Sequence, residues 1–232
     1  MSDSNITFCI TSSGRPTLLC DTLHSFLTLN KYPIAKYIMS EDSGSQYHSA
    51  ECISIAATLL EKETVEKDFI HKFYKRGQSA CIDDMYSRVT TPYIFHCEDD
   101  WNFDPTANAN FIEDSIKILE ARPDIHQVWI RHRFNHGHPM KAMETINGVM
   151  CSEMEKNFLG SWSGFTWNPG VRRLSDYKTM FPNGYHAHQN EGTGSEQSCS
   201  IVANAQGFKA VSLIDTCCSH TGADHHTENY IW

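Results

Sequence analysis

Three consecutive acidic residues are the strongest chemical signal in the sequence. Glu98, Asp99 and Asp100 follow directly on an apolar stretch at 92–97 that is typical of a buried strand. Adjacent carboxylates repel one another and need a counter-charge, and their hard oxygen atoms suit a Mg²⁺ or Mn²⁺ ion that bridges to a substrate diphosphate. The run therefore indicates a divalent-metal site, with a solvated acidic turn as the structural alternative.

Two more acidic features lie where they could join this site. Glu41 and Asp42 end a second predicted strand, and Glu196 begins a predicted helix after a glycine-rich loop. Each has a structural alternative: a turn built on the Asp side chain for the first pair, and a favourable helix-dipole position for Glu196. Convergence of these carboxylates with the acidic run at one sheet edge would carry more weight than any single member.

The elements that must position these residues alternate between strand and helix in the first half of the chain. Apolar runs and amphipathic segments predict strands at 6–11, 36–40, 69–74 and 92–97, and helices from Pro16, at about 49–62 and after Gly77-Gln78. This β-α repeat predicts a mostly parallel sheet with helices on both faces. Such sheets bind ligands beyond the carboxyl ends of their strands, where this sequence has its Gly, Ser, Arg and acidic residues.

The second half is less regular. The pattern there predicts a helix at about 105–121, a strand at 127–131, a weaker strand near 145–151, a short helix after Val171, a helix at 196–205 and a strand at 208–214. No low-complexity linker separates the halves. We expect one domain over 1–232, with a nucleotide-facing half at about 1–104 and a more variable half at about 105–232.

Composition and charge exclude several classes of protein. Hydrophobic residues make up 40% of the 232 residues, which is typical of a globular chain and not of a disordered one. The net charge of −9 repels phosphate backbones and anionic lipids, so non-specific nucleic-acid binding is disfavoured. No apolar stretch approaches the roughly 18 residues of a spanning helix. The nine cysteines form no C-x-x-C pair, which argues against a zinc ribbon and a disulfide framework. We expect a cytoplasmic protein.

Taken in order, these motifs resemble glycosyltransferases of the GT-A fold, most closely the family 2 type. Over nearly the whole chain, the segment 6–15 resembles the first strand and nucleotide loop of that family, 40–45 its acidic turn, 77–83 its Gly-containing nucleotide segment, 98–100 its D-x-D metal motif and 194–197 its catalytic-base region. His220 falls where such enzymes often have a metal-binding histidine. Two positions depart from the pattern: Glu98 opens the D-x-D run, and Gln197 follows Glu196 where the family often has Asp.

The resemblance implies an α/β GT-A fold with a mixed central sheet flanked by helices. It also implies that the half at about 1–104 binds the nucleotide sugar and the half at about 105–232 binds the acceptor. It further implies a metal-dependent, inverting transfer of one sugar from a nucleotide-diphosphate sugar, preferably a UDP-sugar, to an acceptor hydroxyl. Glu196 would be the general base, and Asp100 and His220 would bind Mn²⁺ or Mg²⁺. The residues implied in donor binding are Thr11, Ser13, Arg15, Asp42, Gln78, Asp83, Glu98 and Asp99.

The acceptor is less defined by the sequence. Trp162 and Ser163 lie in an aromatic segment that could stack on a sugar ring, and the acceptor could be a glycan, a protein or a modified nucleobase. Two other functions stay open: a sugar-1-phosphate nucleotidyltransferase of the same fold, and a non-catalytic sugar-binding or metal-binding module.

Overall fold

A computed structural model describes residues 4–132, 138–156, 164–188 and 195–222 of the chain. The first half alternates strands and helices in the order β1 Ile6–Ser12, α1 Pro16–Leu29, β2 Lys36–Glu41, α2 Gln46–Leu59, β3 Glu66–His71, α3 Gln78–Ser87 and β4 Tyr93–Glu98. This order matches the β-α repeat that the sequence predicts, with shifts of a few residues at element ends.

The second half mixes short strands with helices. Its elements are β5 Trp101–Phe103, α4 Phe111–Ala121, β6 Ile125–Trp129, β7 Met140–Ile146, β8 Val149–Met154, β9 Gly170–Arg173, α5 Leu174–Met180, the 3₁₀-helix η2 Tyr185–His188, α6 Ser195–Ala205, β10 Lys209–Leu213 and β11 Cys218–His220.

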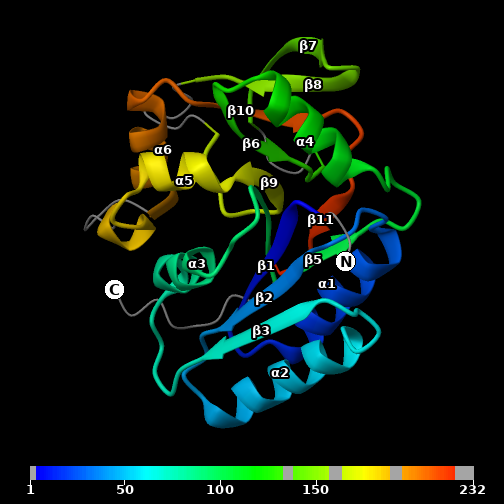
Figure 1. Cartoon of the computed structure of the whole chain (residues 1–232), viewed down its shortest axis with the longest axis vertical. Coiled ribbons are helices and arrows are strands. Elements are labelled where there is room, and N and C mark those ends of the chain that lie inside the picture. The colour runs from blue at the N-terminus through cyan, green and yellow to red at the C-terminus, as the bar shows by residue number, and fades with distance from the viewer. Residues whose placement is uncertain (1–3, 133–137, 157–163, 189–194, 223–232) are drawn as a thin grey trace.

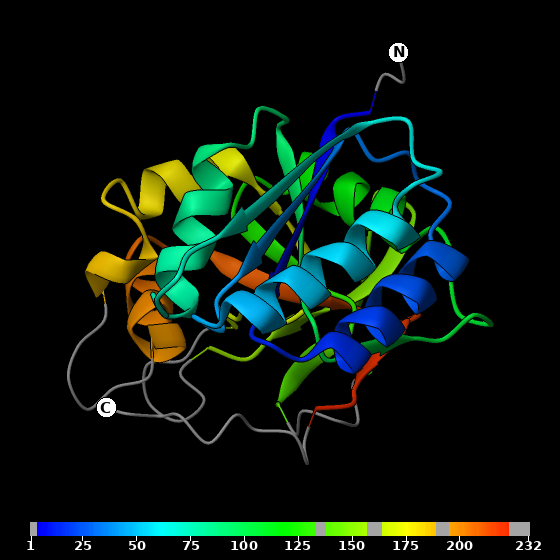
Figure 2. The same cartoon turned by 90° about the horizontal axis from the view of Figure 1, so that it is seen from below.

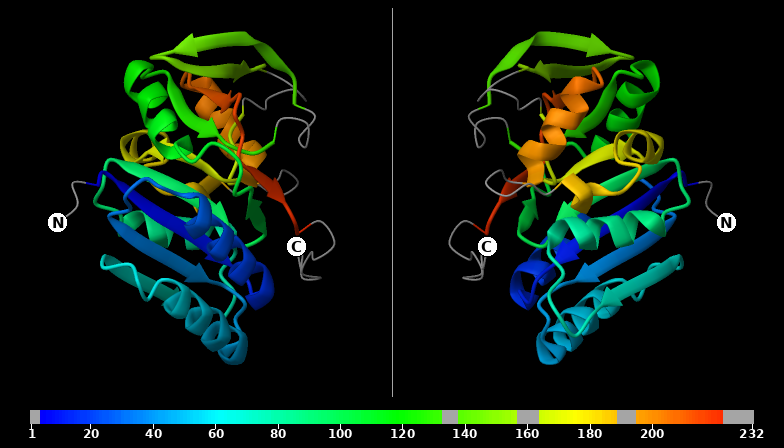
Figure 3. Two further views of the ribbon diagram at one scale, coloured as in Figure 1. Left: turned by 90° about the vertical axis from the view of Figure 1, so that its right-hand side faces the viewer. Right: turned by 90° about the vertical axis from the view of Figure 1, so that its left-hand side faces the viewer.

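One nine-stranded sheet runs through both halves in the order β3-β2-β1-β4-β9-β6-β10-β8-β7 (Figure 1). Strands β3, β2, β1 and β4 are parallel, β9 is antiparallel to β4 on one side and β6 on the other, and β10 is parallel to β6. The β7–β8 hairpin lies at one end of the molecule and α2 at the other (Figure 3). The sheet is therefore mixed, as expected for the fold class.

Helices cover the two faces of the sheet with separate apolar cores. One core joins the sheet to α1, α2 and α4, and in it Phe8 of β1 stacks on Phe26 of α1 with ring centroids 4.5 Å apart. The other joins the opposite face to α3, α5 and α6, around Ile38, Ile94 and Phe165 (Figure 2). The result is a three-layer sandwich of helices, sheet and helices. The ends of the strands, between the helical layers, remain to position polar residues.

Several expected boundaries were wrong for local reasons. The weak strand expected near 145–151 is part of the β7–β8 hairpin, which turns at Asn147 and Gly148, both with positive φ. The helix expected from 105 begins at Phe111, because the Asp104 side chain accepts the backbone N–H of Thr106 and holds a turn there. Strands β5, β9 and β11 were not expected.

A small second sheet is the fold feature that matters most for the site. Strand β11 pairs antiparallel with β5, and this pairing sets His220 opposite Trp101. Of the helices that the structure describes, none has the length and apolarity to cross a membrane.

The buried His126 predicts how stability depends on pH. It lies on β6, stacked on Phe165, and burial lowers its pKa to about 3, with the charges of Arg172 and Arg173 acting in the same direction. The folded protein therefore keeps this ring neutral, whereas the unfolded chain takes up a proton as the pH falls below about 6.5. The contribution of neutral His126 to the free energy of unfolding is thus complete above about pH 6.5, and it is lost progressively as the pH falls towards 3.

We expect His126→Asn to weaken this pH dependence. Between pH 7 and pH 5 the wild type should lose about 2 kcal/mol of unfolding free energy more than the variant, as measured by urea denaturation at the two pH values. His24→Asn, on the exposed face of α1, serves as the control and should behave like the wild type. Equal losses in the wild type and His126→Asn would contradict the prediction.

Candidate functional site

The predicted acidic residues gather at the carboxyl ends of three neighbouring strands. In the sheet register, Thr11 of β1 lies beside Glu98 of β4, and Ser12 of β1 lies beside Glu41 of β2. Asp42, Asp99 and Asp100 follow β2 and β4 directly. The parallel order of these strands therefore brings sequence-distant carboxylates to one edge, as the sequence predicts.

Asp99 holds the loop that follows β1. Its side chain is almost fully buried, and its Oδ2 accepts hydrogen bonds from the Ser12 hydroxyl at 2.9 Å and from the backbone N–H of Ser13 at 3.2 Å. Arg15 completes the set with an ion pair to the same carboxylate. The oxygens of Asp99 and the backbone N–H of Ser13 are therefore already hydrogen-bonded within the chain. Their predicted role in donor binding would be indirect, through the shape that they give to the loop after β1.

Asp100 lies between two cationic or potentially cationic side chains. Its Oδ2 is 2.8 Å from Nη1 of Arg15 and 3.2 Å from Nε2 of His220, although Asp100 and His220 are 120 positions apart in the sequence. The backbone N–H and hydroxyl of Thr221 also bind the Asp100 carbonyl, and Gly222 packs so closely on the carboxylate that a Cβ there would clash. The β5–β11 pairing thus brings His220 to Asp100.

This pair fits two protein ligands of a divalent cation. Oδ1 of Asp100 is buried and has no hydrogen-bond partner in the described part of the chain, and a carboxylate with an imidazole suits Mn²⁺. Within the described ranges there is no cluster of three or more His, Cys, Asp or Glu side chains that could hold a metal ion. A cation here would therefore need further ligands from a bound substrate or from water, as Mg²⁺ sites with nucleotide phosphates do.

Glu98 is a partly buried acid beside this pair. Its Oε1 accepts a hydrogen bond from Nε2 of Gln78 at 2.6 Å, and its Oε2 lies 3.4 Å from Nε1 of Trp101. Burial, followed by the negative charges of Asp100 and Glu196, raises the pKa of Glu98 to about 8. Glu98, Asp100 and Glu196 therefore lie close enough to interact electrostatically. Gln78 joins them through its hydrogen bond to Glu98.

Asp42 and Glu41 hold neighbouring loops. The two carboxylate oxygens of Asp42 accept the backbone N–H groups of Arg76 and Gly77 at 2.7 and 2.8 Å, which fixes the entry to α3. Glu41 accepts the N–H groups of Gly14 and Ser43 at 2.8 and 3.0 Å. Glu41 therefore ties the loop after β1 to the loop after β2, a role that the sequence did not indicate.

Asp83 lies apart from the acidic cluster. It accepts hydrogen bonds from the Tyr177 hydroxyl and from the backbone N–H of Tyr185, both at 2.8 Å, and its Oδ2 lies 2.6 Å from Nδ1 of His186. These contacts join α3 to η2 on the face covered by α5 and α6. The predicted role of Asp83 in donor binding has no support from a contact with Glu98 or Asp100 within the described residues.

Glu196 begins α6 and is held on one side by the chain. Its Oε1 accepts the Thr166 hydroxyl at 2.7 Å and the backbone N–H of Trp167 at 2.6 Å. Its charge acts on Glu98, so the predicted base and the predicted metal motif share one region of the protein.

Arg131 is a cation of the site that sequence reasoning did not place there. It follows β6, and its guanidinium carbon lies 5.4 Å from the ring centre of Trp101 and 5.8 Å from that of Trp129. Burial lowers its pKa, while the charges of Glu196 and Glu98 act in the opposite direction. The sequence feature that could have placed Arg131 in the site is its position at the end of a predicted strand.

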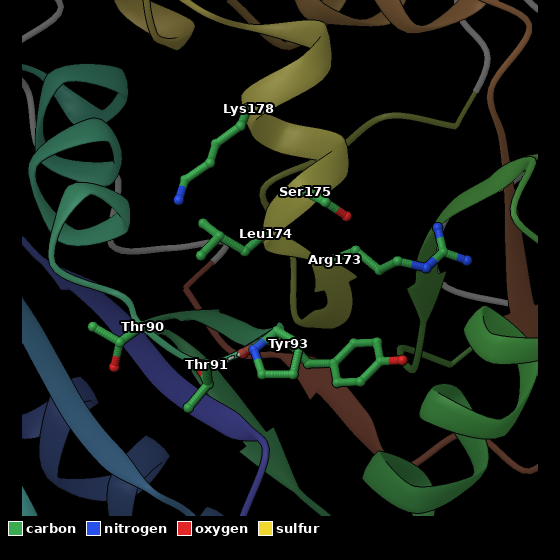
Figure 4. A pocket seen from close by; sticks show the side chains of 8 residues that line it. Thr90, Thr91, Tyr93, Arg173, Leu174, Ser175 and Lys178 are labelled. Atoms are coloured by element: carbon green, nitrogen blue, oxygen red, sulfur yellow. Dashed lines mark hydrogen bonds between the residues drawn. The ribbon is translucent and has the colours of Figure 1, made fainter.

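The acceptor residues Trp162 and Ser163 lie outside the described residues, so their role stays a prediction. A pocket of about 370 Å³ is formed by Tyr93 at the start of β4, Arg173 at the end of β9, and Lys178 of α5 (Figure 4). The start of β4 belongs to the amino-terminal edge of the parallel strands, opposite the acidic cluster. This pocket is therefore separate from the candidate site.

Comparison with known proteins gives the fold. No family model matches the chain, and no curated protein matches it in sequence. Among solved structures, the mannosyltransferase PcManGT from Pyrobaculum calidifontis, in complex with GDP-Man and Mn²⁺, is 11% identical, with a TM-score of 0.62 over 92% of this chain and 56% of that one.

Two structures of residues 1–349 of TarS from S. aureus are similar to the same degree. They are each 10% identical, with TM-scores of 0.63 without a named ligand and 0.61 in complex with UDP-GlcNAc, over 94% and 95% of this chain and 61% of TarS 1–349. The chain thus spans about three fifths of the length of these structures. The chain has the GT-A fold that the sequence predicts.

Proposed function

We propose that the protein is a metal-dependent, inverting glycosyltransferase that moves one sugar from a nucleotide-diphosphate sugar to an acceptor hydroxyl. The observation that carries the proposal is the meeting of Asp100 and His220 at 3.2 Å. Oδ1 of Asp100 is buried and has no hydrogen-bond partner among the described residues, and the charges of Asp100 and Glu196 act on the nearby Glu98. The similar structures PcManGT and TarS, whose complexes hold GDP-Man with Mn²⁺ and UDP-GlcNAc, support a nucleotide-sugar donor.

Charge balance supports a cation in the site. The chain carries a net charge of −9, and a nucleotide diphosphate brings further negative charge towards Asp100. Arg15 is already paired with Asp99 and Asp100. A divalent cation on Asp100 and His220 would supply the Lewis acid that stabilises the departing diphosphate.

The chain's own residues would bind the donor and move one proton. Asp42 and the loop at 76–77 lie at the end of β2, where the donor's nucleobase or ribose is expected, and Gln78 with Glu98 would border the diphosphate side. Oε2 of Glu196 would accept the proton of the acceptor hydroxyl as that oxygen bonds to the anomeric carbon. The bond from that carbon to the diphosphate breaks, and its electron pair leaves with the diphosphate, so attack from the opposite face inverts the anomeric centre.

Several finer assignments remain part of the proposal. Thr11, Ser13, Arg15 and Asp99 would act by holding the loop after β1 against the donor, and Trp162 and Ser163 would contact the acceptor. A UDP-sugar stays the preferred donor of this proposal, and one of the similar structures, TarS, is in complex with UDP-GlcNAc. A panel of nucleotide sugars with Mn²⁺, read out as released nucleotide, would identify the donor with water as the acceptor.

Removing the charge of the proposed base tests the chemistry. We expect Glu196→Gln to lower kcat on the identified nucleotide sugar by roughly 10² to 10⁴, because general-base catalysis contributes about that much. Donor binding should stay within a few-fold of wild type by calorimetry. Glu51→Gln, on the exposed face of α2, is the matched control and should retain full activity. Unchanged turnover in Glu196→Gln would remove Glu196 as the base.

Removing the proposed metal ligand tests the cation. We expect Asp100→Asn to weaken Mn²⁺-dependent binding of UDP or GDP by more than about tenfold, because a carboxylate ligand to the ion is lost. Calorimetric titration of each nucleotide with and without Mn²⁺ measures the effect, with the exposed Asp21→Asn as the control and thermal unfolding to confirm the fold. Absence of any Mn²⁺-dependent nucleotide binding in the wild type would favour a non-catalytic scaffold.

A further inference from the structure

The contacts behind Glu196 come from one short segment that precedes β9. Thr166 is 1% exposed and Trp167 is 5% exposed, and both donate to the same oxygen, Oε1, at 2.7 and 2.6 Å. In the described residues no hydrogen bond reaches Oε2. One oxygen of the carboxylate is therefore anchored in the interior, and the other is left for a ligand.

Thr166 is itself fixed to two central strands. Its carbonyl oxygen accepts Nε2 of Gln127 at 2.9 Å and Nη2 of Arg172 at 3.0 Å, and its backbone N–H donates to Oε1 of Gln127 at 3.3 Å. Gln127 on β6 and Arg172 on β9 are register partners, and both are buried. The Thr166 hydroxyl also accepts the backbone N–H of Asn168 at 3.2 Å. The hydroxyl that binds Glu196 is therefore held by a rigid part of the sheet.

Arg172 adds charge to this support. Arg172 is 3% exposed; burial acts to lower its pKa, while Tyr86, Tyr185 and, to a smaller extent, the carboxylate of Glu196 act to raise it. A buried guanidinium is costly unless a negative charge lies near. The chain from Arg172 through Thr166 to Glu196 thus links a buried cation to the carboxylate at the start of α6.

We propose that Thr166 is a positioning residue, which holds Oε1 of Glu196 so that Oε2 alone is presented to the acceptor hydroxyl. This inference rests on the proposed function, in which Glu196 is the base. A base that must take a proton in the transition state depends on its orientation, and a misplacement of about 1 Å can cost about 10² in rate. The Thr166 hydroxyl sets that orientation without touching the substrate.

The matched pair Thr166→Val and Thr166→Ser tests the proposal. Valine keeps the shape and removes the hydroxyl, so we expect kcat on the nucleotide sugar identified in the panel to fall about 10- to 100-fold, with the donor KM within about twofold of wild type. Serine restores the hydroxyl and should return kcat to within about threefold of wild type. A role confined to folding would instead lower the unfolding temperature and the amount of active enzyme, which active-site titration with nucleotide and Mn²⁺ measures.

A double-mutant cycle separates this role from other effects. In the Glu196→Gln background, Thr166→Val should cause no further loss of the residual rate, because its effect passes through the carboxylate. Thr166→Ala serves as a second variant should valine prevent folding, and the same kcat loss is expected from it.

The outcomes distinguish the inference from the proposed function. A large loss in Glu196→Gln combined with wild-type kcat in Thr166→Val and Thr166→Ala would overturn the positioning role and leave the function standing. Equal losses in the valine and serine variants would also overturn it, because the hydroxyl would then not be what matters. Wild-type turnover in Glu196→Gln, or no turnover of any nucleotide sugar by the wild type, would refute the function and the inference together.

Discussion

Burying several carboxylates at one sheet edge is the constraint on which the rest of this site depends. A buried carboxylate is costly unless hydrogen-bond donors or cations compensate it. Backbone N–H groups provide a large part of the compensation here: those of Ser13 for Asp99, Gly14 and Ser43 for Glu41, and Arg76 and Gly77 for Asp42. The loops after the strands are therefore shaped around acidic side chains.

This pattern divides the acids into two groups. Asp99, Glu41, Asp42 and Asp83 accept backbone N–H groups, so they stabilise loops whatever else they do. Glu98 and Asp100 have only side-chain partners to their carboxylates within the described residues, and side chains can move when a ligand arrives. Glu196 belongs to both groups, because its Oε1 accepts a backbone N–H, whereas its Oε2 accepts none within the described part of the chain. Glu98, Asp100 and Glu196 are therefore the acids whose carboxylates are least committed to holding the backbone.

The sequence predicted the edge but not this division. An acidic run after an apolar strand can be recognised locally, since the carboxyl ends of parallel strands meet. Most of the backbone donors that distinguish one acid from another lie far along the chain, from 27 residues for Gly14 and Glu41 to 103 residues for His186 and Asp83. His220 was implied by the family resemblance, and its position depends on the β5–β11 pairing, which periodicity could not indicate because both strands have three residues. The β7–β8 hairpin, by contrast, could have been predicted from the turn sequence Asn147-Gly148, where a single weak strand was expected.

Three arginines set the charge of the region in different ways. Arg15 is paired with Asp99 and Asp100. Arg131 lies beside two tryptophan rings, and the charges of Glu98 and Glu196 act on it. Arg172 donates a hydrogen bond to the carbonyl of Thr166. The first two come from opposite halves of the chain, and β9, which carries Arg172, is the antiparallel strand that joins β4 to β6. The junction between the halves is therefore also where positive charge balances the acids. In the function proposed above, a donor diphosphate at this junction would compete with Asp100 for Arg15 unless another cation were supplied, and the pair of Asp100 and His220 would hold that cation.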